Sequence, residues 1–168
     1  MSIVAIVGAV TAAKEFVQGI ETVGKFLDGA RSCVITVKNR TDQRLEIVSE
    51  GHDSGGYAVP PDQYVEANTF QVFGHQDNGF MTGSIGNILY RVGPQVQFDE
   101  RFYIRWANPF IGPNAVATST YRLAEMPPPL PELPPLLTAV TSDVYEAFAR
   151  GGSGEVAAQM NFELYRRE

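Results

Sequence analysis

The chain has 168 residues, 44% of them hydrophobic, which fits a single globular domain with a sizeable core. Its net charge of −6 disfavours non-specific binding to nucleic acid, so any affinity for membranes has to come from apolar burial or a specific headgroup site. The single cysteine, Cys33, excludes an internal disulfide, and no apolar run reaches the roughly 18 residues of a transmembrane span.

The first predicted element is an amphipathic helix over residues 3–27, with apolar and polar residues on opposite faces. The apolar face comprises Ile3, Ile6, Val7, Val10, Ala13, Val17, Ile20 and Leu27. The polar face comprises Thr11, Lys14, Glu15, Gln18, Glu21, Thr22, Lys25 and Asp28. Residues 3–13 carry no charge. A helix of this length extends about 40 Å and would reach across a bilayer core of about 30 Å.

This segment allows three interpretations. The apolar face packs on a core, as in most amphipathic helices, or the segment is a membrane arm able to leave the body of the protein. A signal peptide is the third, because a small-residue site occurs at Ala12-Ala13. It is disfavoured, since no positive residue precedes the apolar run and the helical pattern continues past Ala13.

After Gly29-Ala30 the hydrophobic period changes from 3.6 to 2, which is typical of strands. The predicted strands are residues 33–38, 44–48, 69–73, 79–92, 96–106, 117–124 and 156–165. Residues 39–42 are predicted as a turn and the Gly- and Pro-rich residues 51–63 as a loop. Cys33 and Trp106 lie in alternating strands and are predicted to be buried. The pattern predicts a mainly β protein, an antiparallel β-sandwich with the N-terminal helix packed on one sheet.

We expect residues 1–168 to form one domain. Residues 1–28 would be the detachable amphipathic helix and residues 32–168 the sandwich. The proline-rich residues 126–137 favour polyproline II and are interpreted as a stiff crossover between strands. The alternatives are a ligand for a proline-recognition domain and an apolar loop for a membrane surface.

Recognisable catalytic patterns are missing from the sequence. His52 and His75 do not have the spacing of a zinc site, and the neighbours His52-Asp53-Ser54 point to alternate faces rather than meeting as a triad. The sequence therefore argues against an enzyme, and no cofactor or metal is expected.

Several stretches carry a resemblance to a known family. Residues 33–39 look like a first strand that ends in Asn, and residues 73–79, followed by Thr82-Gly83-Ser84-Ile85-Gly86, are similar to a Tyr-Asn-Gly-Gln-Lys…Thr-Gly-x-x-Gly segment. Residues 102–110 are similar to an apolar strand ending in Ser-x-Pro-Tyr. With the N-terminal helix in front, the chain resembles the actinoporins, the pore-forming cytolysins of sea anemones, over roughly residues 1–125 and the last strand.

The resemblance implies a sandwich that docks on a membrane and an N-terminal helix that inserts and oligomerises into a pore. It places a lipid-headgroup pocket at Ser54, Ile85, Pro109 and Phe110, and a membrane-facing loop at Phe110 and Ile111. The residues expected to insert into the membrane are Ile3, Val4, Ile6, Val7, Val10, Val17 and Ile20. The residues expected to line a wet pore are Lys14, Glu15, Gln18 and Glu21.

The chain departs from the family at several points. The family has a Tyr- and Trp-rich run after Pro-Tyr, where this chain has residues 111–116 without an aromatic residue. The Arg-Gly-Asp loop is missing, and the proline-rich stretch takes the place of the second helix. Sphingomyelin is therefore not predicted as the target, and the lipid, the pore stoichiometry and the source stay open. The same fold also carries fungal fruit-body lectins.

The function we expect is that of a hemolytic, cytolysin-like toxin that is secreted or released in soluble form and acts on a target-cell membrane. Its partners would be membrane lipid and further copies of itself. One alternative is a lectin-type or headgroup-binding module without pores, in which Asp53, Ser54, Gln76, Asp77 and Asn78 of loops 51–56 and 74–79 hold a glycan. Another is a subunit of a multi-protein toxin assembly.

Overall fold

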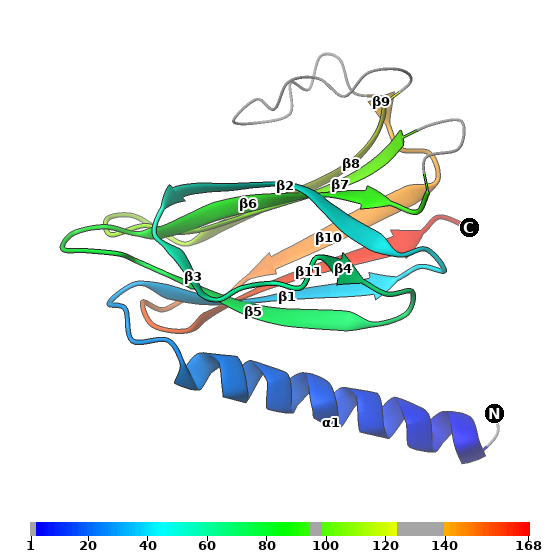
Figure 1. Ribbon diagram of the computed structural model, residues 1–168, viewed down its shortest axis with the longest axis horizontal. Helices are drawn as coiled ribbons and strands as arrows, with labels where there is room; N and C mark the ends of the chain where they lie inside the picture. Colours follow the sequence, from blue (N-terminus) through cyan, green and yellow to red (C-terminus); the bar gives the residue numbers. More distant parts are fainter. Residues whose placement is uncertain (1–2, 95–98, 124–139) are drawn as a thin grey trace.

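The computed structural model describes residues 3–94, 99–123 and 140–168, with side chains described for 12–94, 99–123 and 141–168. Two β-sheets pack face to face, and helix α1 (Ile3–Lys25) lies along the outer face of one of them (Figure 1). The predicted β-sandwich with a helix packed on one sheet is confirmed. The proline-rich residues 126–137, predicted as a crossover, lie outside the described residues.

The sheet that carries α1, here called sheet A, contains five strands. In spatial order they are β10 (Tyr145–Gly151), β11 (Ala158–Arg166), β1 (Ser32–Arg40), β5 (Phe70–Gln76) and β3 (Gly56–Val59). Strand β1 pairs with β5 in antiparallel and with β11 in parallel, which is the exception to the predicted antiparallel pairing. The buried alternation predicted for the last strand holds from Ala158 onward, whereas Val156 is exposed in the preceding loop.

The opposite layer, sheet B, contains six strands. In spatial order they are β4 (Tyr64–Val65), β2 (Leu45–Ser54), β6 (Ser84–Val92), β7 (Asp99–Asn108), β8 (Ala115–Leu123) and β9 (Val140–Thr141). The predicted strand 79–92 begins only at Ser84, because residues 79–83 form the turn after β5. Strand β10, which is rich in alanine and charged residues, was not predicted.

The prediction of a loop over residues 51–63 was wrong for most of its length. Strand β2 continues through Ser54, and β3 begins at Gly56, so the chain passes from sheet B to sheet A at Gly55. Gly55 has a φ of 87°, and a Cβ there would lie 2.2 Å from the backbone oxygen of Gln76. The glycines that suggested a loop instead allow two sheets to meet at a tight corner.

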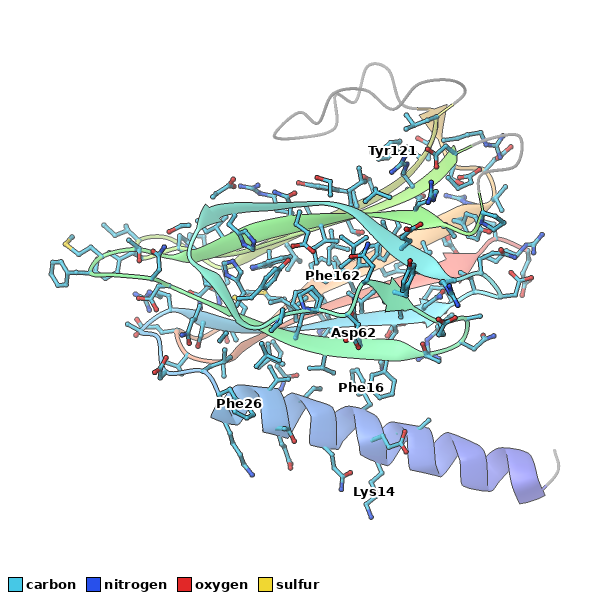
Figure 2. The ribbon with its side chains drawn as sticks, viewed as in Figure 1. Lys14, Phe16, Phe26, Asp62, Tyr121 and Phe162 are labelled. Carbon is cyan, nitrogen blue, oxygen red and sulfur yellow. The ribbon has the colours of Figure 1, made fainter. Side chains whose placement is uncertain are left out.

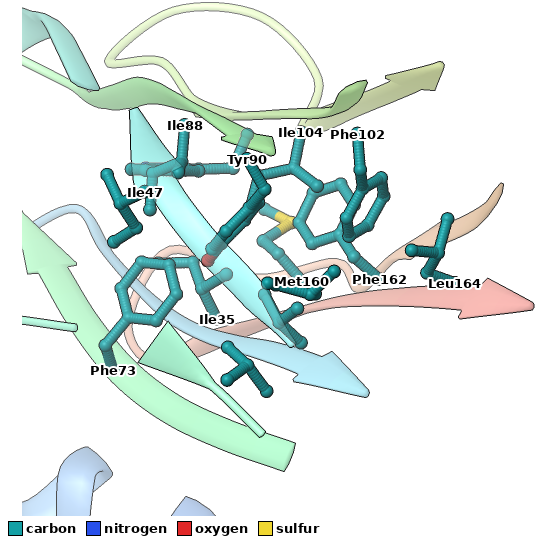
Figure 3. Close-up of a cluster of buried hydrophobic side chains, with 14 of the residues drawn as sticks. Ile35, Ile47, Phe73, Ile88, Tyr90, Phe102, Ile104, Met160, Phe162 and Leu164 are labelled. Carbon is teal, nitrogen blue, oxygen red and sulfur yellow. The ribbon is translucent and has the colours of Figure 1, made fainter. Parts of the chain in front are cut away.

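The main core lies between the two sheets and fills with alternate side chains from both. Figure 3 shows Ile35, Phe73, Met160 and Phe162 of sheet A facing Ile88, Tyr90, Phe102 and Ile104 of sheet B. Cys33 and Trp106 are fully buried in this core, as predicted. No described residue of α1 belongs to it.

Gly86→Ala should destabilise the sandwich, because a Cβ at this position would lie 2.5 Å from Cζ2 of Trp106 and 2.9 Å from the oxygen of Gly51. Overpacking of this kind costs about 1–3 kcal/mol. Urea unfolding followed by Trp106 fluorescence measures the loss. Gly79→Ala is the control, since a Cβ at Gly79 meets nothing within 4 Å. Equal midpoints for the two variants would contradict the packing described here.

Candidate functional site

Helix α1 rests on sheet A through a small apolar cluster that is separate from the main core. Val23 of the helix and Leu27, which follows the end of α1, are buried against Val34 of β1, and Ile20 packs at the edge of this cluster. A Cβ at Gly74 of β5 would lie 2.9 Å from Cγ1 of Val23 and from Cδ2 of Leu27. The glycine therefore lets the helix approach the sheet closely.

Phe16 makes the second contact between helix and sheet. Its ring packs edge-on against Phe70 with 5.1 Å between ring centroids, and Nζ of Lys38 lies 4.1 Å from the Phe16 centroid. Val17, predicted on the apolar face, is 53% exposed in this state. Figure 2 shows Phe16 pointing toward the sheet and Lys14 pointing away from it. Sequence reasoning missed Phe16 because it lies one position off the apolar stripe, although its aromatic ring was a usable signal.

The predicted membrane residues divide into two groups. The side chains expected to line a pore, Lys14, Glu15, Gln18 and Glu21, are all exposed on the outer face of α1. The insertion residues Ile3, Val4, Ile6, Val7 and Val10 lie within α1, but their side chains are outside the described set. The structure thus places both groups on one helix at the surface of the sandwich.

Residues 28–31, here called the hinge, connect α1 to β1 and are bonded to the end of β5. Oε1 of Gln76 accepts hydrogen bonds from the backbone nitrogens of Asp28 (3.0 Å) and Gly29 (3.2 Å), and its Nε2 donates to Oδ1 of Asp28 (2.9 Å). The backbone nitrogen of Asp77 donates to the oxygen of Arg31 at 2.9 Å. The hinge therefore depends on the first residues of the β5–β6 loop.

Three of the four residues predicted to form a headgroup pocket lie near one another. Ser54 is the register partner of Ile85 on neighbouring strands, and Oγ of Ser54 accepts a hydrogen bond from the backbone nitrogen of Gly83 at 3.1 Å. A Cβ at Gly83 would lie 2.9 Å from Cα of Pro109. The fourth, Phe110, turns toward the hinge, with its ring centroid 5.5 Å from the guanidinium carbon of Arg31.

A pocket of about 440 Å³ opens at this end, on the side of Phe110 that faces the β10–β11 loop. Arg31, Asn108, Pro109, Asn114, Gly152 and Glu155 are among its lining residues. Nη1 of Arg31 pairs with Oε1 of Glu155 at 2.7 Å, so the cation is already neutralised. The pocket shares only Pro109 with the predicted headgroup site.

Three apolar side chains project at the same end of the sandwich. Phe80 and Met81 of the β5–β6 loop are 92% and 54% exposed, and Ile111 of the β7–β8 loop is 80% exposed. Ile111 was predicted to face a membrane, whereas Phe80 and Met81 were missed. The lack of charge from Asn78 to Tyr90 was the sequence signal that marked them.

Most polar side chains required by the lectin interpretation already have partners within the chain. Oδ2 of Asp53 pairs with Nη2 of Arg105 at 2.6 Å, while Gln76 and Asp77 bind the hinge. Gly74, predicted at the start of a loop, lies in β5 and is buried. These loops therefore stabilise the fold rather than presenting a ready set of free hydrogen-bonding groups.

His75, a fully buried ionisable group at this end, connects the two sheets. Its Nδ1 is 2.8 Å from Oγ of Ser84, whose hydroxyl donates to the backbone oxygen of His75. Because this hydroxyl proton is already used, Nδ1 of His75 carries the ring proton. Nε2 of His75 then accepts a hydrogen bond from Nδ1 of His52 at 3.0 Å. Burial, and secondly the charge of His52, lowers the pKa of His75 to about 4.

The free energy of unfolding should fall as the pH decreases from about 6.5, the ordinary pKa of histidine, to about 4. His75 takes up its proton in the unfolded chain first, so its contribution is present above pH 6.5 and lost as the pH falls toward the folded-state pKa. Urea unfolding over a pH series measures this slope. His75→Gln should flatten it, and an unchanged slope in that variant would contradict the assignment.

Phe16→Ala should loosen α1 on the sheet while the sandwich melts nearly as before, because the helix lies outside the main core. Hydrogen exchange of the α1 amides measures this local opening. Val17→Ala is the matched control, because Val17 is the next residue in the helix and its side chain is largely exposed. Equal exchange in both variants would mean that Phe16 does not hold the helix.

Some features are not found in the described part of the chain. No helix there is both long and apolar enough to cross a bilayer. Nor do histidine, cysteine and carboxylate side chains gather there into a group that could hold a metal ion. Burial raises the pKa of the Cys33 thiol to about 11, so this cysteine is a core residue rather than a reactive one.

Comparison with known proteins finds a solved structure with a similar fold. No protein-family model and no curated protein matches the sequence. Among solved structures, the crystal structure of the lipid binding protein Nakanori is similar, with a TM-score of 0.69 and 18% sequence identity. The likeness covers 94% of this chain and 80% of the other. At this identity the comparison shows a shared fold, which is the fold that the sequence predicted.

Proposed function

We propose that this protein is a membrane-active, actinoporin-like protein in which the sandwich docks on lipid and α1 then leaves sheet A to enter the bilayer. The observation that carries the proposal is the separation of α1 from the main core. The core closes between the two sheets without any described residue of the helix. The sandwich can therefore stay folded while the helix moves.

The energetic cost of releasing α1 is modest. Among the described side chains of α1 and the two residues that follow it, only Val23 and Leu27 are buried, with Phe16 and Ile20 partly so. Burying one such side chain contributes about 1.5–3 kcal/mol. The uncharged residues 3–13 carry several Ile and Val residues, whose burial in lipid would offset the loss of these contacts.

The polar face of α1 supports pore formation by several copies. Lys14, Glu15 and Gln18 are costly to bury in lipid, but a ring of helices would turn them toward a wet lumen. The mixture of lysine and glutamate implies weak ion selectivity. Action on a target-cell membrane after release in soluble form belongs to the same proposal.

Two further lines of support come from outside the helix. The sequence resembles the actinoporins in the order of its elements, and a protein of the same fold, Nakanori, is described as lipid binding. No described feature favours catalysis, and the polar loops that a glycan would need are engaged within the chain. Lipid is therefore the partner we propose.

Val17→Asp should abolish dye leakage from vesicles and leave the thermal melt unchanged. Val17 is largely exposed in the docked helix, so the charge is tolerated there, but it would be buried in an inserted helix. Gln18→Asp is the matched control, because position 18 lies on the face expected to stay wet and should retain leakage. Val7→Asp extends the test to the uncharged segment.

Dye leakage caused by the wild-type protein is measured first, because it tests the proposal directly. Vesicles made from total lipid extracts of several kingdoms should include a composition that leaks. If none leaks, pore formation is wrong. If Val17→Asp and Gln18→Asp leak equally, pores form without insertion of α1.

A further inference from the structure

We infer that the β5–β6 loop is the membrane-contact element of this chain, and that contact at this loop loosens the hinge of α1. The inference rests on the proposed function and names the surface that first contacts the membrane. The contact surface consists of Phe80, Met81 and Ile111, here called the tip.

The tip is exposed and apolar. Phe80 and Met81 project from one loop and Ile111 from its neighbour, and the two loops touch where a Cβ at Gly83 would meet Cα of Pro109. Met81 has a φ of 60°, a backbone conformation that non-glycine residues rarely adopt. Exposed apolar side chains on two adjacent loops fit a soft apolar layer such as a lipid surface.

The two sequence segments that carry the tip are uncharged, and the nearby Arg31 guanidinium beside Phe110 is paired with Glu155. No charged residue occurs from Asn78 to Tyr90 or from Trp106 to Tyr121, although the chain carries a net charge of −6. Charged rims steer protein partners and fix their orientation, and none is present in these two segments. Uncharged segments instead let these loops enter the interface without desolvating ions of their own.

The tip is connected to the hinge from both of its loops. Gln76, the last residue of β5, and Asp77, the first residue of the β5–β6 loop, accept hydrogen bonds from the backbone nitrogens of residues 28, 29 and 31. From the β7–β8 loop, the backbone oxygen of Phe110 accepts a hydrogen bond from Nη2 of Arg31 at 3.0 Å. Displacement of either loop therefore acts on the segment that fixes the end of α1.

The fit between hinge and loop is close. A Cβ at Gly29 would lie 2.1 Å from Oδ1 of Asp77 and 3.1 Å from Cβ of Gln76. The hinge backbone thus lies directly against these two side chains, and a shift of the loop cannot be absorbed by empty space.

Binding at the tip is tested by flotation with vesicles of phosphatidylcholine, alone or mixed with phosphatidylserine or sphingomyelin. The double variant Phe80→Ser, Met81→Ser should lower partitioning about a hundredfold, which corresponds to about 2.7 kcal/mol. The control is Phe148→Ser, another exposed phenylalanine, which lies on strand β10. Binding by the double variant equal to wild type, or no wild-type binding to any of the three vesicles, overturns the inference.

Orientation is tested with a polarity-sensitive dye on Met81→Cys. Cys33 is fully buried, so the introduced thiol takes the label. Fluorescence should rise on vesicle addition at position 81 and stay constant at Asp42→Cys, in the β1–β2 turn at the other end of β1. The reverse pattern, or a wild-type dimer that Phe80→Ser, Met81→Ser disrupts without lipid, assigns the tip to another occupant and overturns the inference.

Coupling to the hinge is tested by hydrogen exchange of the α1 amides. Vesicles should raise exchange in wild type but not in the double tip variant. Gln76→Ala should raise it about fivefold without vesicles, which corresponds to about 1 kcal/mol. Gln159→Ala, an exposed glutamine of the same sheet, should not. Unchanged exchange in Gln76→Ala overturns the coupling, whereas tip binding without dye leakage contradicts only pore formation.

Discussion

The structure depends on sheet A, which presents an apolar surface on each of its two faces. Its strands alternate, so that Ile35 and Phe73 face the main core while Val34 and Val72 face outward toward α1. The period of two in a β-strand produces these two faces from the same residues in sequence. The inner face is closed by sheet B and is complete in itself, and the outer face needs only a small apolar cover. The helix on this outer face can therefore move to another environment without exposing the core.

The two ends of the sandwich differ in the side chains that they expose. The end that carries the hinge presents exposed apolar side chains and an ion pair whose arginine is largely covered, Arg31 with Glu155, whereas the opposite end carries pairs exposed on both sides, such as Arg44 with Glu66 and Arg166 with Asp42. Such pairs contribute little stability but keep that end in water. The molecule is therefore polarised along its strands, and this polarity agrees with docking by one defined end. The hinge lies at that end, next to the loops that would make first contact.

The sequence was sufficient for the fold class, and less so for the site. Alternation in β1 and in the last strand predicted buried faces correctly, because each of these strands has one face in the core. The Gly-rich residues 51–59 were wrongly predicted as a loop, since composition alone does not distinguish a loop from a corner between sheets. Phe16 and Phe80 were missed for opposite reasons, since Phe16 packs just off the predicted apolar stripe whereas Phe80 is almost fully exposed. Their roles depend on tertiary placement, which periodicity does not contain.

The parallel pairing of β1 with β11 has a consequence for how the chain folds. Thr36 and Asn161, whose side chains bond across this pair, are 125 positions apart in the sequence. Sheet A therefore cannot close until nearly all of the chain has been synthesised, and such non-local pairing folds slowly. Until then one edge of β1 is unpaired, which is a template for association between chains. Refolding at high concentration should accordingly compete with aggregation, and β1 is the strand through which it would begin.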